Sequence, residues 1–487
     1  VTVRVPHLSW VSMEGEAKRD YPASINYQSP WSPKYRYVED HFARVNTAMT
    51  RGTPAIRVGV IHPVESCWIH WGPAEQTALA REELDTNFEN VTEWLLFGSV
   101  DFDYISESLL PSLCERGGAP LEVGNMKYDV IIVPGCETVR ASTCERLDAF
   151  RRAGGKLIFM GDAPKYLDAR PSDIPAKLWA EAEHISFTRG ALLGALEGYR
   201  NVDIRQANGE LTGSLVHQLR RDGDGLWLFV AQGKLPYNKD ISRKQKIKIT
   251  VKGIYRATLY DTLGGKIKPC RFSHSGDSTV IPAELWLHDS LLIRLDPCDT
   301  EETWSPAAAQ KTVEVPMRIP ACAPYALSEP NVLLLDRAEF SFDGGEFEPS
   351  EELLRIDTLL RRKLGWTPWG GSSNQPWCIP AEPTEHTVKL RFTIESRIPV
   401  RDAHLALEAA EDTAITLNGV RVPSVIDGYF TDRSIKTVAL PPIPAGISVL
   451  ELEAPFGKRT AIEWCYLTGS FGVHLAGAHA VIEALPE

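Results

Sequence analysis

One βαβ pattern, between residues 127 and 164, constrains the fold more than any other part of the chain. Residues 130–133 form an unbroken apolar run that ends at a Pro-Gly pair, which is typical of a strand buried on both faces. The spacing after it predicts an amphipathic helix over residues 143–152. A second apolar run, 156–160, follows the helix. Strand, crossover helix and strand predict a parallel pair with a right-handed connection.

The same alternation extends on both sides of this unit. Residues 56–61 and 101–105 are expected strands, and a long helical stretch at 72–98 separates them. This succession of strands and helices predicts a doubly wound, flavodoxin-like domain over residues 53–185. No GxGxxG motif follows its first strand, so a dinucleotide site is not expected.

The pattern changes after residue 185. Residues 186–297 contain short strand-like runs separated by turn signals, which predict an antiparallel β-sandwich domain. The weakly patterned, Pro- and Ala-rich segment 298–325 is the expected linker. Residues 326–487 again alternate, with Asn418-Gly419 as a strong hairpin signal. They predict a second all-β domain, a jelly roll.

The first 52 residues contain one strand-like piece, a polar and aromatic loop, and a helix expected at 35–49. One strand cannot form a sheet alone, so residues 1–52 are expected to be the last strand and helix of a truncated (β/α) barrel. The fold class predicted for the whole chain is multidomain, α/β plus all-β. Because the chain starts at Val1 inside such a pattern, we expect a fragment of a longer protein.

Charge and cysteine content limit the partners. The 487 residues carry a formal net charge of −12, which argues against general binding to nucleic acid or to an anionic membrane. The nine cysteines include no CxxC pair, so neither a zinc site nor a dense disulfide framework is expected. The sequence does not distinguish a cytoplasmic from a secreted location.

The N-terminal loop holds the candidate catalytic residue. In α/β barrels the active site lies at the carboxyl ends of the strands. Sugar cleavage needs carboxylates for acid–base or nucleophilic chemistry, and binding needs polar groups and aromatic rings. Glu14 is therefore the candidate catalytic carboxylate, and the alternative is a solvated, salt-bridged loop. The candidate substrate-binding residues of this loop are His7, Trp10, Lys18, Arg19 and Asp20.

Aromatic residues of the jelly roll form a second set of candidates. Exposed rings on such sandwiches can stack on sugars, although a tryptophan there is more often part of the core. We expect carbohydrate contact from Trp369 and Tyr429. Asp427, Asp432 and Arg433 are candidate polar partners, although a hairpin loop explains these three residues as well. The full aromatic set is Trp366, Trp369, Trp377, Tyr429, Phe430 and Trp464.

Cys136 follows the first strand of the βαβ unit. Class I amidotransferases and their relatives carry a reactive Cys on a tight turn after a strand, with a His partner. In this domain that turn corresponds to Met160-Gly161-Asp162, which contains no Cys, whereas Cys136 follows the strand before it. A structural role for Cys136 is therefore favoured, and a thiol enzyme is the alternative.

The order of segments resembles that of a known family. Residues 7–22 (HLSWVSMEGEAKRDYP), 35–51 and 58–66 (VGVIHPVES) resemble the barrel end and following domain of multidomain glycoside hydrolases, closest to the large α-L-rhamnosidases. YDVIIVPG and AGGKLIFMGDAP look like the β-galactosidase trimerisation-type domain. Residues 405–422 (LALEAAEDTAITLNGVRV) and 465–473 (CYLTGSFGV) are similar to a galactose-binding-like jelly roll.

The resemblance implies the C-terminal accessory portion of a glycoside hydrolase that acts on plant or microbial polysaccharides or glycosides. The parent enzyme would use two carboxylates, and a calcium ion would bind in its barrel. The fragment itself is expected to need no cofactor and to be inactive, because most of the barrel is absent. The implied partners are a carbohydrate substrate and, through the trimerisation-type domain, further copies of the chain. A non-enzymatic carbohydrate-binding or assembly module remains an alternative.

Overall fold

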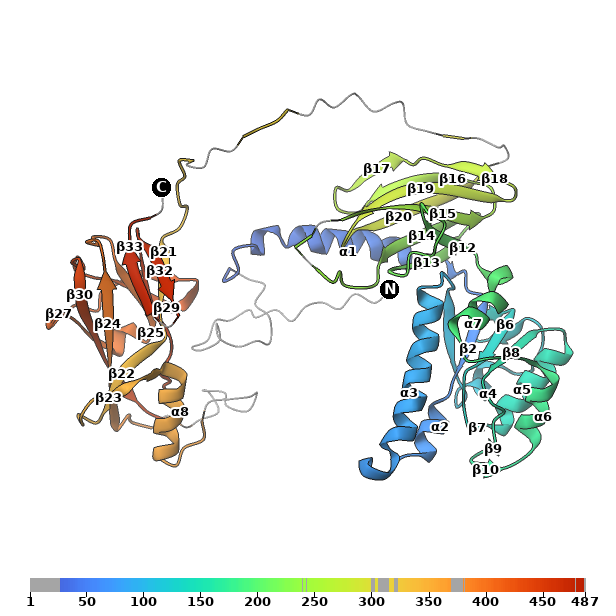
Figure 1. Cartoon of the computed structure of the whole chain (residues 1–487), viewed down its shortest axis with the longest axis horizontal. Helices are drawn as coiled ribbons and strands as arrows, with labels where there is room; N and C mark the ends of the chain where they lie inside the picture. Colours follow the sequence, from blue (N-terminus) through green and yellow to red (C-terminus); the bar gives the residue numbers. More distant parts are fainter. Residues whose placement is uncertain are drawn as a thin grey trace. The chain divides into compact units, whose positions relative to one another are not determined.

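The structure is a computed structural model that describes residues 27–238, 240–241, 243–298, 303–304, 315–318, 323–368, 380, 382–477 and 479–485. Within these residues the fold is mixed, rich in strands and organised in several sheets, in agreement with a chain that combines α/β and all-β parts. The chain divides into two compact units (Figure 1). The described residues of the first unit lie within 36–312, and those of the second within 27–35 and 313–487.

A five-stranded parallel sheet forms the α/β part of the first unit. Its strands lie in the order β11-β8-β6-β2-β3, and every neighbouring pair is parallel. Because β2 lies between β3 and β6, the chain leaves β2 toward one side and later returns on the other. The carboxyl ends of β2 and β6 therefore form the topological switch point, where doubly wound sheets bind ligands. The strands are β2 (Val58–His62), β3 (Phe102–Ser106), β6 (Val130–Val133), β8 (Lys156–Met160) and β11 (Glu183–Ile185).

Helices cover both faces of this sheet (Figure 1). Successive side chains on a strand point to opposite faces, so Val130 and Ile132 pack with α3 and α7, whereas Ile131 and Val133 pack with α4, α5 and α6. Since α7 lies beyond residue 185, the core of this domain extends past the expected boundary. The helices are α3 (Ala74–Leu96), α4 (Leu110–Leu113), α5 (Ala141–Arg152), α6 (Ile174–Glu181) and α7 (Arg189–Ala195).

The first unit also contains two larger antiparallel sheets that enclose one apolar core. A two-stranded sheet of β4 (Leu121–Val123) and β5 (Met126–Tyr128) and a three-stranded sheet of β10 (Arg170–Pro171), β9 (Tyr166–Leu167) and β7 (Thr138–Val139), in that order, belong to the α/β part. The strand orders of the two larger sheets are β1-β13-β14-β20-β16-β17 and β12-β15-β19-β18. The strand-like run at 257–267 comprises parts of two strands joined by a turn. The strands are β1 (Thr53–Pro54), β12 (Val202–Gln206), β13 (Leu215–Asp222), β14 (Gly225–Gln232), β15 (Lys244–Lys252), β16 (Tyr255–Asp261), β17 (Lys266–Pro269), β18 (Ser273–Ser275), β19 (Ser278–Trp286) and β20 (Ser290–Pro297).

The helix expected at 35–49 is α1 (Arg36–Met49). Its second half packs against the six-stranded sheet, where Val45 and Met49 contact a cluster that includes Trp227 and Leu292. Its first half exposes apolar side chains, namely Tyr37, Val38 and Phe42. Thr53 and Pro54 pair with β13, so they extend the sandwich rather than the doubly wound domain. The strand expected before α1 lies outside the described residues.

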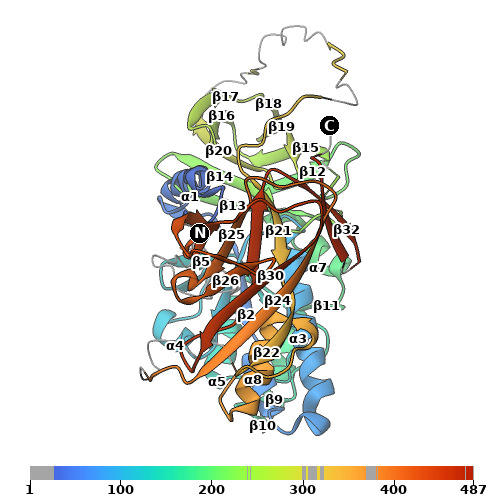
Figure 2. The ribbon, with the colours of Figure 1, turned by 90° about the vertical axis from the view of Figure 1, so that its left-hand side faces the viewer.

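The second unit is a β-sandwich, almost entirely antiparallel, with one helix on its core (Figure 2). One sheet has the order β21-β31-β25-β29-β28, and the other contains β23-β22-β24-β30-β26-β27 with β32 and β33. Asn418 and Gly419 both have positive φ (49° and 78°) between β26 and β27, which confirms the expected tight hairpin. In the described residues of both units, no helix is long and apolar enough to span a membrane.

The bounds of the second unit's elements are as follows: β21 (Asn331–Leu335), β22 (Arg337–Phe342), β23 (Glu348–Glu352), α8 (Leu353–Lys363), β24 (His386–Ser396), β25 (His404–Glu408), β26 (Ala414–Leu417), β27 (Val420–Val422), β28 (Ile426–Phe430), β29 (Asp432–Ala439), β30 (Gly446–Phe456), β31 (Cys465–Gly469), β32 (Gly472–Ala476) and β33 (His479–Glu483).

Candidate functional site

Most of the residues predicted to form the site fall outside the described part of the chain. The catalytic role of Glu14 therefore stays a prediction, and so does the sugar contact of the loop around it. The residues concerned are His7, Trp10, Glu14, Lys18, Arg19, Asp20 and Trp369. Tyr429 is described, and the site is built from it.

Tyr429 lies on β28, at the edge of the five-stranded sheet of the second unit, with 51% of its surface exposed. Its ring meets that of Tyr27 edge to face, with the centroids 6.2 Å apart and an interplanar angle of 86°. The guanidinium of Arg433 lies 4.8 Å from the centroid of the Tyr27 ring. The Arg433 amide N–H also donates to the Tyr27 hydroxyl at 3.3 Å. We call Tyr27, Tyr429 and Arg433 the tyrosine edge.

Two acidic residues near the tyrosine edge have different roles. Asp432 is 1% exposed, and its Oδ1 accepts hydrogen bonds from the amide and hydroxyl of Ser434, both at 2.8 Å. Asp432 therefore stabilises the turn. The prediction that it is a polar partner for a sugar is wrong, because its carboxylate is buried. Asp427 lies two positions before Tyr429 and is partly exposed, although His404 Nε2 lies 3.0 Å from its Oδ2. The Thr437 hydroxyl also donates to Asp427 Oδ1 at 2.6 Å. The tyrosine edge thus presents one exposed ring beside a cation and a partly exposed carboxylate whose two oxygens already have partners in the protein.

The other described aromatic candidates are partly buried and contact side chains of the protein itself. Trp366 stacks on Phe456 with the ring centroids 5.8 Å apart, and Trp464 donates from Nε1 to Glu352 Oε1 at 2.7 Å. Phe430 packs on the ring of Tyr466. The structural interpretation therefore holds for these three rings, and Tyr429 is the exposed one among the described members of the set.

The environment of Cys136 opposes a nucleophilic role. Burial raises the pKa of its thiol, and the carboxylate of Glu107 adds to the increase. A thiol nucleophile needs the opposite shift, because the thiolate is the reactive species. The turn after β8, where the reactive Cys of a class I amidotransferase would lie, holds Gly161 with φ +78° and no thiol. The structure therefore disfavours a thiol enzyme based on Cys136.

Side chains of the protein occupy the amide groups at the carboxyl end of the parallel sheet. Ser66 is fully buried, and its Oγ accepts from the N–H groups of Glu137 at 3.0 Å and Thr138 at 3.2 Å. These amides follow β6, so they take the position of an oxyanion-binding loop. At the start of α5, Glu107 accepts from the Arg140 amide at 2.8 Å and Asp168 from the Ala141 amide at 3.1 Å. These backbone N–H groups are therefore not available to bind an anionic ligand.

Glu107 is the most perturbed acid at this end of the sheet. It directly follows β3 and is 1% exposed. Burial raises its pKa to about 7, and the hydrogen bond from the Arg140 amide opposes that increase. Near neutral pH the carboxyl group thus holds its proton about half of the time. Sequence reasoning missed this residue, because a lone Glu after a strand is not distinguishable from a surface acid.

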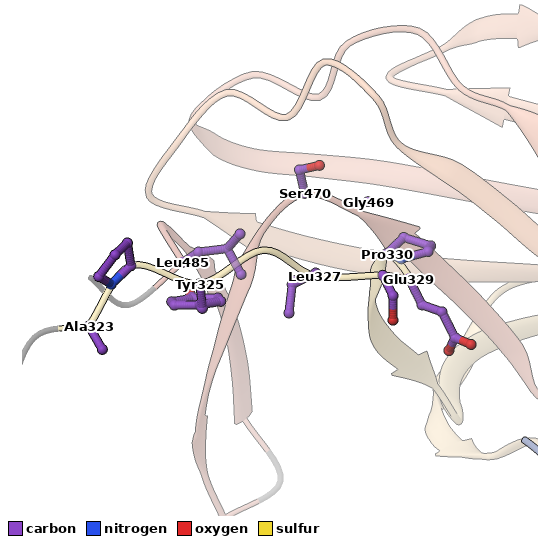
Figure 3. A pocket seen from close by; sticks show the side chains of 10 residues that line it. Ala323, Tyr325, Leu327, Glu329, Pro330, Gly469, Ser470 and Leu485 are labelled. Atoms are coloured by element: carbon purple, nitrogen blue, oxygen red, sulfur yellow. The ribbon is translucent and has the colours of Figure 1, made fainter. Parts of the chain in front are cut away.

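A large open hollow lies on the second unit, with a volume of about 770 Å³. It runs along the extended segment 323–330 beside Gly469, Ser470 and Leu485 (Figure 3). Glu329 is the charged member of its described lining, and the other side chains are small or apolar. This hollow offers surface but no converging polar groups. Neither unit contains, in its described residues, a cluster of three or more His, Cys, Asp or Glu suited to a metal ion.

Comparisons with known proteins give weak likenesses to glycosidases. No protein-family model and no curated protein matches the chain. A rhamnosidase from Novosphingobium sp. PP1Y is 17% identical with a TM-score of 0.41, over 89% of this chain and 38% of that one. An alpha-L-fucosidase isoenzyme 2 from Paenibacillus thiaminolyticus is 10% identical (TM-score 0.34; 55% and 52% covered). A beta-galactosidase from Bacillus circulans sp. alkalophilus is 10% identical (TM-score 0.39; 58% and 48% covered).

These neighbours are glycoside hydrolases, and this chain spans between 38% and 52% of their lengths. The scores are too low to assign a domain, an activity or a substrate to this chain.

Proposed function

We propose that this chain is the C-terminal accessory portion of an α-L-rhamnosidase-like glycoside hydrolase. It would comprise a partial (β/α) barrel end, a flavodoxin-like domain, a β-sandwich and a galactose-binding-like jelly roll. The parent enzyme would cleave glycosidic bonds with two barrel carboxylates, and its barrel would bind calcium. Within this chain, the role is to hold carbohydrate through the jelly roll.

The tyrosine edge is the observation that carries this proposal. An exposed aromatic ring packs against the apolar C–H face of a sugar, while charged neighbours take its hydroxyl groups. Tyr429 supplies the ring, and Tyr27 fixes it edge to face. Arg433 lies beside it with its guanidinium 4.8 Å from the Tyr27 centroid, and the nearby Asp427 side chain is 38% exposed although both of its oxygens have partners in the protein. The edge strand leaves room for an extended glycan, because β28 has no strand on its outer side within the described sheet.

The exposed half of α1 supports an accessory role in a larger protein. Tyr37, Val38 and Phe42 are 54%, 41% and 41% exposed on the first half of the helix. Val38 and Phe42 lie on the same stripe of the helix as Val45 and Met49, which are fully buried farther along. The apolar stripe is therefore covered over only half of its length. A further layer of the parent protein, such as a barrel, would cover the exposed half.

A glycan array probed with the 487-residue chain tests the proposal. The chain should bind at least one plant or microbial glycan, and Tyr429→Ala should weaken that binding about tenfold, because the sugar loses its aromatic platform. Tyr429→Phe should keep most of it. Tyr237, which is fully exposed on a loop of the first unit, gives the matched control Tyr237→Ala. Equal binding by the Tyr429→Ala and Tyr237→Ala chains would overturn the role of the tyrosine edge.

Turnover assays test the accessory assignment separately. The purified chain should release no product from aryl glycosides, since the proposal assigns at least one of the two catalytic carboxylates to a part of the parent barrel outside this chain. Detectable hydrolysis would contradict the assignment of the catalytic pair to the parent barrel. The same assays with added calcium should remain negative.

A non-enzymatic carbohydrate-binding or assembly module is the second candidate, because the tyrosine edge needs no barrel in order to bind a glycan. The two candidates differ in the sequence upstream of Val1. Several hundred residues of βα pattern there would favour the hydrolase, and a signal peptide directly upstream would favour the module. In either case light scattering would test the proposed homo-oligomer.

A further inference from the structure

A second, walled pocket lies at the topological switch point of the parallel sheet. Its volume is about 330 Å³. Part of its lining comes from α2 (Val64–Ile69), which follows β2, and part from β7 (Thr138–Val139), which follows β6. The turn between β9 (Tyr166–Leu167) and β10 (Arg170–Pro171) forms another wall. We call this the switch-point pocket, and the lining residues that matter are Glu65, Trp68, Ile69, Thr138, Arg140 and Asp168.

The wall that carries Asp168 is fixed in an unusual conformation. Asp168 and Ala169 both have positive φ, 50° and 59°, although neither is a glycine. Hydrogen bonds hold the turn in place: the Asp168 amide donates to the Val139 carbonyl at 3.1 Å, and the Ala169 amide to Thr138 Oγ1 at 3.0 Å. Asp168 Oδ1 in turn accepts from Ala141. The carboxylate is thus held at the pocket by surroundings that overcome the backbone strain.

The pocket combines one unused donor group with unused acceptors. Arg140 donates from Nε to Glu65 Oε1 at 2.7 Å, and the Glu65 side chain is 12% exposed. Within the described part of the chain, the Nη atoms of Arg140 and Oδ2 of Asp168 have no hydrogen-bond partner. Glu65 Oε2 is buried and is also without a partner there. A ligand that matches these groups accepts a hydrogen bond from the guanidinium and donates hydrogen bonds to the carboxylates.

These groups select the chemistry of the ligand. A fully deprotonated inorganic anion such as sulfate accepts from Arg140 but has no proton to donate to Asp168. The nearby backbone amides that would hold an inorganic anion of any kind already donate to Ser66, Glu107 and Asp168. An ammonium ion donates to Asp168 but cannot accept from Arg140. Adjacent hydroxyl groups do both. Trp68 is 57% exposed and Ile69 39% exposed, so the lining also offers an apolar platform.

We propose that the switch-point pocket binds a single neutral sugar residue. Arg140 and Asp168 bind adjacent hydroxyl groups, Glu65 orients the guanidinium, and the Trp68 indole packs on the apolar face of the sugar. This inference deepens the proposed function and rests on it for the class of ligand. It adds a second carbohydrate site, on the doubly wound domain of the first unit, which the tyrosine edge does not include.

Calorimetric titration of the full chain with methyl pyranosides tests this site. The panel contains neutral hexosides, 6-deoxyhexosides and pentosides, and a dissociation constant on the order of 1 mM is expected for a ligand of this size. Asp168→Asn keeps the acceptor for the Ala141 amide and tolerates the positive φ, but it replaces Oδ2 by a donor, so binding should weaken at least tenfold. Trp68→Ala should weaken it similarly, and Trp68→Phe less.

The controls separate this pocket from the tyrosine edge. Trp286 is 47% exposed elsewhere in the first unit, and Trp286→Ala should leave binding unchanged. The Tyr429→Ala chain should still bind the methyl glycoside. If Tyr429→Ala abolishes binding while Trp68→Ala and Asp168→Asn do not, the pocket proposal fails and the proposed function stands. If no glycan binds on the array but the pocket still binds the methyl glycoside, the pocket proposal stands and the proposed function fails.

Two further outcomes would overturn the pocket proposal. One is a negative result for every methyl glycoside up to tens of millimolar, about tenfold above the expected dissociation constant. Negative means that calorimetry detects no heat of binding and that the NMR signals of the glycoside do not broaden when the protein is added. The other is displacement of the glycoside by inorganic phosphate or tetramethylammonium, since either result would show that the pocket selects for charge. Circular dichroism of each variant establishes that it is folded before it is titrated.

Discussion

Each unit buries a carboxyl group, and the two groups are neutralised in different ways. In the second unit Asp357 is 3% exposed on α8, and Arg361, one turn later, donates from Nε at 2.8 Å. In the first unit Glu107 is 1% exposed, and its hydrogen bond comes from a backbone amide. Burial raises the pKa of both, but Arg361 opposes the shift for Asp357, whereas Glu65 adds to it for Glu107.

This difference distinguishes a buried acid that stabilises the fold from a buried acid that indicates a functional site. A carboxylate paired with an arginine inside a core holds structure together, and the Asp357–Arg361 pair also joins α8 to the loop before β31, because Asp357 Oδ1 accepts from the Ile462 amide at 3.1 Å. A carboxyl group kept neutral by a proton is sensitive to pH. Glu107 lies at the carboxyl end of the parallel sheet, where ligands of such sheets bind.

The largest expected effect is the loss of the arginine. Arg361→Met should lower the free energy of unfolding of the second unit by about 3–5 kcal/mol, because Asp357 is left charged and buried. Differential scanning calorimetry of the full chain measures it. The double change Asp357→Leu with Arg361→Met should recover most of the loss. Equal destabilisation by the single and the double change would contradict the role of the ion pair, since packing rather than charge would then be the cause.

The next effect is the pH dependence of the first unit. The folded pKa of Glu107, about 7, is above its ordinary value of 4.5, so the folded state holds the proton longer than the unfolded state. Stability should therefore fall as the pH rises from about 4.5 to 7, by about 3 kcal/mol in total. Glu107→Gln should remove that loss, so the variant should gain stability relative to the natural chain at pH 8 but not at pH 4.5.

Urea unfolding at several pH values checks this prediction. Asp101, whose pKa burial also raises to about 7, contributes a second loss over a similar window, and Asp101→Asn should remove that part. Glu122→Gln, at a carboxylate whose side chain is 62% exposed, is the matched control and should change the pH profile little. A profile unaltered by Glu107→Gln would show that the fold does not raise the pKa of Glu107.

A smaller effect is expected where Ser66 occupies the amides after β6. Ser66→Ala leaves two buried N–H groups without their acceptor, at a cost of about 1–3 kcal/mol to the first unit. Thermal unfolding of the full chain measures this change. The transition of the second unit should not move. A change below about 0.5 kcal/mol in the first unit would mean that water replaces the hydroxyl and that the sheet end is open.

The smallest effects are expected at the exposed rings. Tyr429→Ala and Trp68→Ala should each change the stability of their unit by no more than about 0.5 kcal/mol, because half or more of each side chain is exposed. The two changes should nevertheless weaken sugar binding. A large loss of stability at either position would assign that ring to packing instead.

Local patterns sufficed for the elements of the fold. The apolar runs at 130–133 and 156–160 are buried parallel strands, and Asn418-Gly419 is the expected hairpin. The start of α5 was not predictable in the same way. Its N-cap residue is Arg140, whose side chain has no hydrogen-bond acceptor. The acceptors for the first amides of the helix are Glu107 and Asp168, which come from more distant parts of the chain.

The candidate site was predictable where residue type alone carried the signal. Tyr429 is exposed as expected, whereas Trp366 and Trp464 are partly buried and contact side chains of the protein itself, and sequence does not distinguish the two cases. Tyr27 meets Tyr429 from some 400 positions away, and no local pattern indicates that contact. Asp168 was missed because its turn has positive φ without glycine, so the usual hairpin signal is lacking.

Glycan binding by the intact 487-residue chain is the most direct test of whether this molecule is built to hold carbohydrate. The account predicts that an array will show at least one plant or microbial glycan bound, with the signal reduced about tenfold in Tyr429→Ala and kept in Tyr237→Ala. Binding of no glycan at all by a folded chain would contradict it, and so would binding that is indifferent to Tyr429.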